Sequence, residues 1–233
     1  MRYSSERYNI ICSLIPQAGS QFAKKAIDVG CGEGVFTKML WGKGYESLGI
    51  DINEEKIAVA RKQFGDSRLR FEIGDANKIK LPSKSIDLVL SLELIEHLED
   101  PQLLLSEIRR VLKTGGLLVI STPNRCSLEG LGGRILAKLR RGRWNAWDDT
   151  HKTIFSSSEF MRLLRQKGFE PIKVIGYYYF VSVYPFKSLP CLVRLQESFG
   201  FIRFTHSTRC LLNKIGFDTI CVCALKDNRI LER

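Results

Sequence analysis

Apolar and polar positions along the chain follow the periods of strands and helices in turn. Segments of helical spacing lie between short apolar runs, which predict strands near 25–30, 46–51, 70–75, 85–91 and 117–122. The helical segments are 34–43, 54–64 and 101–112. Asp100-Pro101 is a typical start for the last of these helices, and Thr114-Gly115-Gly116 is expected to stop it. This alternation predicts an α/β fold, a mostly parallel sheet with helices on both faces.

The pattern continues near the C-terminus. Ser156 and Glu159 have the spacing of a capping box, which predicts a helix to Lys167. Residues 169–177 and 219–225 then predict a sixth and a seventh strand.

Three segments fall outside this alternation, and we expect them to elaborate a single domain over 1–233. Residues 1–20 predict a short amphipathic helix and a linker, with Tyr8, Ile11, Cys12 and Ile15 on one side of the helix. Residues 124–154 predict a basic lid, with Arg134, Lys138, Arg140, Arg141 and Arg143 along apolar helical spacing; a structural cover helix is the alternative. Residues 178–218 form an insertion rich in aromatic side chains.

Cysteine usage, apolar runs and net charge indicate the compartment and the kinds of partner to expect. The seven cysteines among 233 residues include no C-x-x-C pair, which indicates a reducing, cytoplasmic compartment. The N-terminus lacks the apolar segment of a signal peptide, and no run is long and uncharged enough to span a bilayer. A net charge of +11 favours an anionic acceptor, a nucleic acid or an anionic membrane surface, or serves solubility alone.

The most informative motif is the run from Asp28 to Gly34, DVGCGEG, between the first strand and the next helix. Glycines at 30, 32 and 34 let a ligand approach the backbone of the turn. A dinucleotide site would have G-x-G-x-x-G, and here position 35 is Val. A tight turn that binds nothing is the alternative reading.

Two further carboxylates end strands. Asp51 follows the glycine turn by about twenty residues, the place from which a carboxylate reaches a ribose diol; capping the next helix is its alternative role, although Asn53 suits that role equally. Asp75 ends the third strand, at the height of an adenine amino group.

With these motifs, the chain resembles the class I S-adenosylmethionine-dependent methyltransferases, and among them the methyltransferase type 11/12 domains and the quinone-pathway O-methyltransferases. The resemblance covers roughly residues 25–177 and the last strand, and it rests on the segments DVGCGEG, GIDI, GDA, SLELIEH and LKTGGLLVISTPN. It implies a Rossmann-like sheet of seven strands whose last strand is antiparallel. It also implies S-adenosylmethionine as cofactor, held by Asp28, Gly30, Cys31, Gly32, Gly34, Asp51, Ile52, Asp75, Ala76, Ser91 and Leu92.

The segment E-x-x-E-H, Glu93 to His97, resembles a Mg²⁺ site of quinone-pathway O-methyltransferases and of methyltransferases acting on small-RNA 3′ ends. In the latter a further histidine follows, and His151 takes that position here. A cation would lower the pKa of an acceptor oxygen. Alternatively, the Glu-His pair stabilises its loop, and His151 lines the acceptor pocket or acts as a general base.

We therefore expect methyl transfer to a small-molecule or lipid-like acceptor, on oxygen. A basic helix beside an aromatic segment also predicts peripheral binding to an anionic membrane. An RNA methyltransferase is an alternative, less favoured because the aromatic residues are not interleaved with basic ones. A non-catalytic subunit of the same fold is another, opposed by the intact glycine turn and its acidic residues.

Overall fold

An eight-stranded sheet organises the described part of the chain, which in this computed structural model comprises residues 5–19, 23–64, 68–127, 148–177, 204–206 and 218–225. Its strands are β1 Lys25–Val29, β2 Glu46–Asp51, β3 Leu69–Ile73, β4 Ile86–Leu92, β5 Leu112–Pro123, β6 Phe169–Tyr177, β7 Phe204–His206 and β8 Asp218–Leu225. The helices are α1 Ser5–Leu14, α2 Val35–Gly42, α3 Glu54–Phe64, the short 3₁₀ helix η1 Ile95–His97, α4 Pro101–Val111 and α6 Ser157–Gln166.

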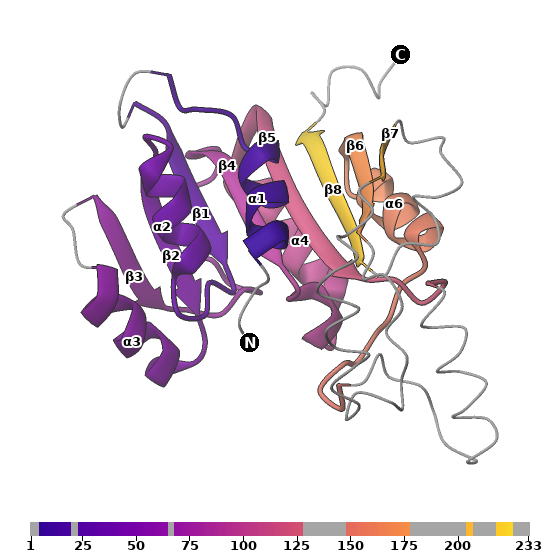
Figure 1. Ribbon diagram of the computed structural model, residues 1–233, viewed down its shortest axis with the longest axis horizontal. Helices are drawn as coiled ribbons and strands as arrows, with labels where there is room; N and C mark the ends of the chain where they lie inside the picture. The colour runs from indigo at the N-terminus through magenta and orange to yellow at the C-terminus, as the bar shows by residue number, and fades with distance from the viewer. Residues whose placement is uncertain are drawn as a thin grey trace, which may run out of the picture.

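The order of the strands is β3-β2-β1-β4-β5-β8-β6-β7 (Figure 1). The first five strands pair in parallel, whereas β8 runs antiparallel to both of its neighbours, β5 and β6. This confirms the expected Rossmann-like sheet with an antiparallel last strand. The count of seven needs one correction, because β7 arises within the aromatic insertion and adds a three-residue edge strand antiparallel to β6.

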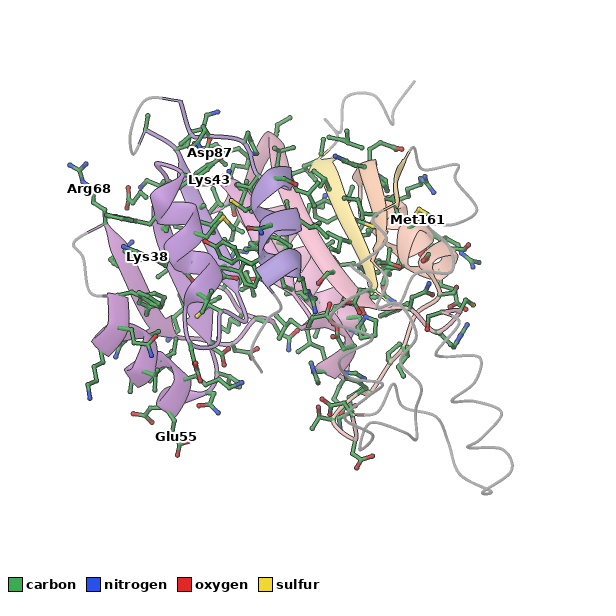
Figure 2. All side chains as sticks on the ribbon, viewed as in Figure 1. Lys38, Lys43, Glu55, Arg68, Asp87 and Met161 are labelled. Carbon is green, nitrogen blue, oxygen red and sulfur yellow. The ribbon has the colours of Figure 1, made fainter. Side chains whose placement is uncertain are left out.

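Alternate side chains of the central strands pack on opposite faces. In β5, Leu118 and Ile120 join the core beneath α4 and α6, while Val119 joins the core beneath α1 and α2. Helix α3 covers β3 through Ile57 and Ala60. Figure 2 shows side chains filling the space between helices and sheet, with Glu55 and Arg68 at the periphery.

The predicted helix starts are confirmed at two caps, and the predicted end of one helix is wrong. The carboxylate of Asp100 accepts from the backbone N–H of Gln102, and Ser156 and Glu159 form the complete capping box. However, α4 ends at Val111, before Thr114. Leu112 is fully buried and already pairs with Ile86 of β4, so the chain is extended there, and Gly115, with φ of 74°, serves a bend inside β5.

The N-terminal helix is present and packs on the face that α2 covers, through Ile10, Ile11 and Ile15. Most of the predicted basic lid and of the aromatic insertion lies outside the described residues. Among the described helices, none has the length and apolar character needed to cross a bilayer.

Candidate active site

The glycine turn leaves β1 and is fixed to the neighbouring strand by its own backbone. The N–H groups of Gly30 and Cys31 both donate to the carbonyl of Ile50 in β2, at 2.8 and 3.0 Å. Gly34 begins the helical turn with φ of 84°, and a Cβ there would lie 2.5 Å from the ring of Phe71. The sharp turn therefore needs glycine at 34, both for its backbone angle and for space.

Asp28 lies beneath this turn, and only 3% of it is exposed. The hydroxyl of Thr37 in α2 donates to its carboxylate at 2.7 Å. Burial raises the pKa of Asp28 to about 7, against the lowering by the Thr37 hydrogen bond, and the nearby Asp51 raises it further. The site thus holds a carboxyl group that a cationic ligand would readily ionise.

Asp51 closes the turn from the end of β2. One carboxylate oxygen accepts from the N–H of Gly32 at 2.8 Å, and the other accepts from the N–H of Asn53 at 2.9 Å. The side chain of Asn53 accepts from Lys56, so Asn53 caps α3. Asn53, and not Asp51, is therefore the cap of α3. The carboxylate of Asp51 lies partly exposed beside the glycine turn.

The ends of β2 and β3 border a surface next to the turn. Ile52 is 75% exposed and Ile73 is 46% exposed, and Ala76 is half-buried. Asp75 is exposed and accepts from the N–H of Asn77 in a local turn. Two exposed isoleucines beside an exposed carboxylate fit the predicted adenine position, where an aromatic base would cover apolar surface and donate to Asp75.

Three predicted cofactor residues are less accessible. Ser91 and Leu92, at the end of β4, are buried as whole residues, so the structure leaves little of either open to a ligand. Cys31 is half-buried, and burial raises the pKa of its thiol, which therefore stays protonated. Its sulfur occupies the space that a side chain at Gly49 would need, so Cys31 fills space in the turn.

A second group of polar side chains lies after β4. Glu96, His97 and His151 place one ligand atom each within 4.8 Å of one another. Glu96 is fully buried, and within the described residues neither carboxylate oxygen meets the geometry of a hydrogen bond, although the nearby Thr122 side chain favours its charged form. Burial, and then the charge of Glu93, raise the pKa of Glu96 well above its usual value. Burying a carboxyl group without hydrogen bonds costs free energy of folding, and such a group is therefore a candidate for binding a ligand or carrying a proton.

The two histidines differ in how they are held. The Nδ1 of His97 lies 2.9 Å from the hydroxyl of Thr150, and its Nε2 lies 4.0 Å from the Glu96 carboxylate. Burial, and then the neighbouring His151, lower the pKa of His97, which is neutral at neutral pH. The Nε2 of His151 lies 4.0 Å from the carboxylate of Asp148, and the side chain of His151 is 7% exposed. The imidazoles thus differ in their polar neighbours.

Glu93 does not join this group, although the E-x-x-E-H pattern suggested that it would. Its carboxylate accepts from Ser121 at 2.6 Å and pairs with the guanidinium of Arg7 at 2.7 Å. Its backbone has a positive φ of 50°, which is uncommon for a residue with a side chain. The turn at Glu93 directs its carboxylate to Arg7 and leaves Glu96 to the histidines.

Comparison with known proteins connects this geometry to a family. Residues 27–120 match the family model described as "Methyltransferase domain". A probable S-adenosylmethionine-dependent methyltransferase of Mycolicibacterium smegmatis is 28% identical over 156 residues, which are 67% of this chain and 56% of the relative. Residues 27–120 therefore carry a domain of the S-adenosylmethionine-dependent methyltransferase family. Ubiquinone biosynthesis O-methyltransferases are similar to this chain too: that of Idiomarina loihiensis is 29% identical, over 66% of this chain and 65% of the relative.

The corresponding protein of Ruegeria pomeroyi is 32% identical to this methyltransferase over 66% of the chain and 62% of the relative. The match therefore spans less than two thirds of each of these three relatives. A Thermotoga maritima structure described as a possible histamine N-methyltransferase has a TM-score of 0.63 at 21% identity, covering 94% of this chain and 87% of the other. A Haloferax volcanii methyltransferase in complex with the Trm112 activator has a TM-score of 0.66 at 19% identity, covering 94% and 89%. At these identities the structures show a shared fold.

The structure thus places Asp28, the glycine turn and Asp51 together: Asp51 is hydrogen-bonded to the turn, and Asp28 is held by Thr37 of α2. Asp75 follows the neighbouring strand β3. Their contacts with a cofactor remain predictions. Sequence reasoning missed Thr37, Arg7 and Asp218. For Arg7 a signal was available, because it precedes Ile11 and Ile15 by four and eight residues and so lies on the apolar side of the predicted helix.

Proposed function

We propose that this methyltransferase transfers the methyl group of S-adenosylmethionine to an oxygen atom of a small or lipid-like acceptor. One observation carries the choice of oxygen. Glu96 and His97 follow β4 and His151 follows β5, so their group lies on the side of the sheet away from Asp51 and Asp75. Transfer to a hydroxyl requires that its proton be removed, and these imidazoles are suited to accept it.

In the proposed reaction a lone pair of the acceptor oxygen attacks the methyl carbon, and the electrons of the C–S bond return to sulfur. The products are a methyl ether and the neutral thioether S-adenosylhomocysteine. His151 takes the hydroxyl proton and later releases it to solvent. Asp148 stands 4.0 Å from His151, and hydrogen bonds from Thr150 lower the pKa of Asp148. That carboxylate therefore remains charged and stabilises the imidazolium.

The relatives named for ubiquinone biosynthesis support an acceptor hydroxyl on an aromatic ring, with an apolar tail. Such a hydroxyl is more acidic than an aliphatic one, so a histidine is a competent base for it. The aromatic residues of 178–218 supply the sequence feature that favours an apolar acceptor.

Alternatively, the same three side chains would hold a divalent cation, with His151 as a ligand in place of its role as base. Glu96 offers a buried carboxylate that makes no hydrogen bond in the described structure, and His97 offers Nε2. When bound, such a cation holds the acceptor oxygen and lowers its pKa. One carboxylate and two imidazoles suit Mn²⁺ or Fe²⁺ as donors better than Mg²⁺, which prefers oxygen ligands. Titration calorimetry with Mg²⁺ and with Mn²⁺, repeated on Glu96→Gln, tests this point. We expect heat with wild type and none with the variant.

The proposed reaction is tested with a tritium-labelled methyl donor. Catechols and phenols, each with and without a prenyl tail, are compared with primary amines and with total RNA. We expect labelled methyl ethers from the hydroxyl compounds. His151→Gln should lose at least tenfold in kcat while binding S-adenosylhomocysteine normally, and Arg162→Gln, an exposed change on α6, is the matched control. Labelled amines or RNA without labelled ethers would contradict transfer to oxygen.

Peripheral membrane binding is a separate proposal that rests on the +11 charge and the basic stretch within 124–154. Co-sedimentation with vesicles checks it. We expect more protein to bind vesicles that contain anionic lipid than neutral ones, and equal binding to both would contradict an electrostatic attraction.

A further inference from the structure

The N-terminal helix α1 brings a guanidinium group into the interior of the molecule. Arg7 is only 6% exposed. Its helix is fixed by the buried Ile11 and Ile15 and by stacking of Tyr8 on Phe36 of α2, with ring centres 5.7 Å apart. A buried arginine is rare unless its charge is paired, so its partners are informative.

These partners come from three other parts of the sheet. One guanidinium nitrogen, Nη2, lies 2.7 Å from the carboxylate of Glu93, after β4, and donates to Ser121, in β5, at 3.2 Å. The other terminal nitrogen, Nη1, lies 3.2 Å from the carboxylate of Asp218, the first residue of β8. A single side chain therefore joins α1 to the adjacent ends of β4, β5 and β8.

Charge explains why an arginine is needed there. Asp218 and Glu96 are fully buried, and the side chain of Glu93 is 18% exposed. Within the described residues, Arg7 is the cation that lies within ion-pair distance of both Glu93 and Asp218. Arg7 compensates the two that it touches, and it holds Glu93 in its positive-φ turn, away from Glu96.

We propose that Arg7 is a positioning residue for the acceptor side of the active site. It fixes the loop that carries Glu96 and His97, and so sets where the base and the acceptor meet. Of the predicted cofactor residues, Asp28, Asp51 and Asp75 belong to the ends of β1, β2 and β3, away from Arg7 in the strand order, whereas the buried Ser91 and Leu92 of β4 directly precede Glu93. Loss of Arg7 should therefore impair the acceptor reaction while cofactor binding persists. The inference rests on the proposed function only in placing the acceptor beside this loop.

The first measurement needs no acceptor. Hydrogen exchange is followed in wild type, Arg7→Gln, Arg7→Lys and the control Arg162→Gln, each saturated with S-adenosylhomocysteine. For Arg7→Gln we expect at least tenfold faster exchange in residues 92–97 and unchanged exchange in residues 30–34. The affinity for S-adenosylhomocysteine should stay within threefold of wild type. Equal exchange of 92–97 in wild type and Arg7→Gln, or a tenfold loss of affinity, would overturn the proposal.

A second measurement tests the role of charge. Without the guanidinium, Glu93 and Asp218 lose the cation that compensates them, so Arg7→Gln should lower the melting temperature more than Arg7→Lys, which keeps a positive charge. Glu93→Gln added to Arg7→Gln should restore part of that loss. An equal loss in Arg7→Gln and Arg7→Lys would contradict charge compensation.

A third measurement uses the acceptor that the labelled screen identifies. Arg7→Gln should lower kcat/KM for that acceptor at least thirtyfold, and Arg7→Lys should recover part of it. Unchanged kcat/KM would overturn the proposal. Because the first two measurements do not use an acceptor, failure of the screen would count against the proposed function and leave the result on Arg7 intact.

Discussion

The buried Asp28 should make cofactor binding depend on pH near neutrality. Its pKa is about 7 in the absence of ligand, chiefly because burial disfavours the charged form. We predict that the ammonium group of S-adenosylhomocysteine binds only the ionised carboxylate. The affinity should then be almost constant above pH 8 and fall about tenfold for each pH unit below 6, because the ligand must displace a proton.

The size of the effect follows from the shift itself. Raising the pKa of Asp28 from 3.8 to about 7 corresponds to about 4 kcal/mol at 1.36 kcal/mol per tenfold change in ionisation. The pKa of the folded state lies above that of the unfolded state. The unliganded protein is therefore most favoured by this group below pH 4, and it loses that stability as the pH rises through 7. Bound ligand should oppose the loss, since its cation stabilises the carboxylate.

The assay is titration calorimetry with S-adenosylhomocysteine between pH 5.5 and 8.5. Asp28→Asn should bind more weakly at pH 8 and show no dependence on pH. Thr37→Val removes the hydrogen bond that favours the ionised form, so the midpoint should move to higher pH, while Thr37→Ser should resemble wild type. An affinity for the wild-type protein that is constant from pH 6 to pH 8 would refute the reasoning.

Three further predictions concern other parts of the fold and site. Gly34→Ala should lower the free energy of unfolding by about 1–3 kcal/mol in urea titrations, because a Cβ at φ of 84° would meet the ring of Phe71, and Gly42→Ala is the matched control with open space around it. Ser156→Ala should cost about 1 kcal/mol by removing the capping box of α6, whereas the exposed Ser158→Ala should not destabilise the protein. Asp51→Asn should weaken S-adenosylhomocysteine binding at least tenfold in calorimetry, with a smaller effect on 2′,3′-dideoxy analogues that lack the ribose diol; equal loss for both ligands would contradict a role of Asp51 at the ribose.

The positions of the predicted cofactor residues could be read from the sequence because each depends on a short local segment. Each strand carries its own polar residue at its end, so reading the strand places the residue. Asp28 and the glycine turn follow from β1, and Asp51 follows from β2. What remained open was how these groups bind one another, and the hydrogen bond from Thr37 to Asp28 could not be read from spacing, because two elements meet there.

The acceptor side was less predictable because its parts are distant in the sequence. Arg7 and Asp218 are 211 positions apart in the sequence, and only the position of β8 between β5 and β6 brings them together. The E-x-x-E-H pattern predicted that both glutamates would face the same ligand. The positive φ at Glu93, which no pattern in the sequence predicts, directs the Glu93 carboxylate to Arg7 instead.

This arrangement also bears on the net charge of +11, which suggested an anionic partner. The described residues around the proposed acceptor site carry mainly negative charge, opposite in sign to the net charge of the chain. Glu93, Asp218 and the neighbouring Asp148 are carboxyl groups, and Arg7 pairs with the first two. Even with Glu96 protonated, a phosphate entering beside His151 would meet carboxylates, and repulsion between buried like charges is strong. An acceptor that presents a neutral hydroxyl at the reacting end meets no such opposition. Basic residues that attract an anionic surface should therefore lie away from the reacting atoms. High salt should then weaken membrane binding more than it raises KM for a neutral, water-soluble acceptor.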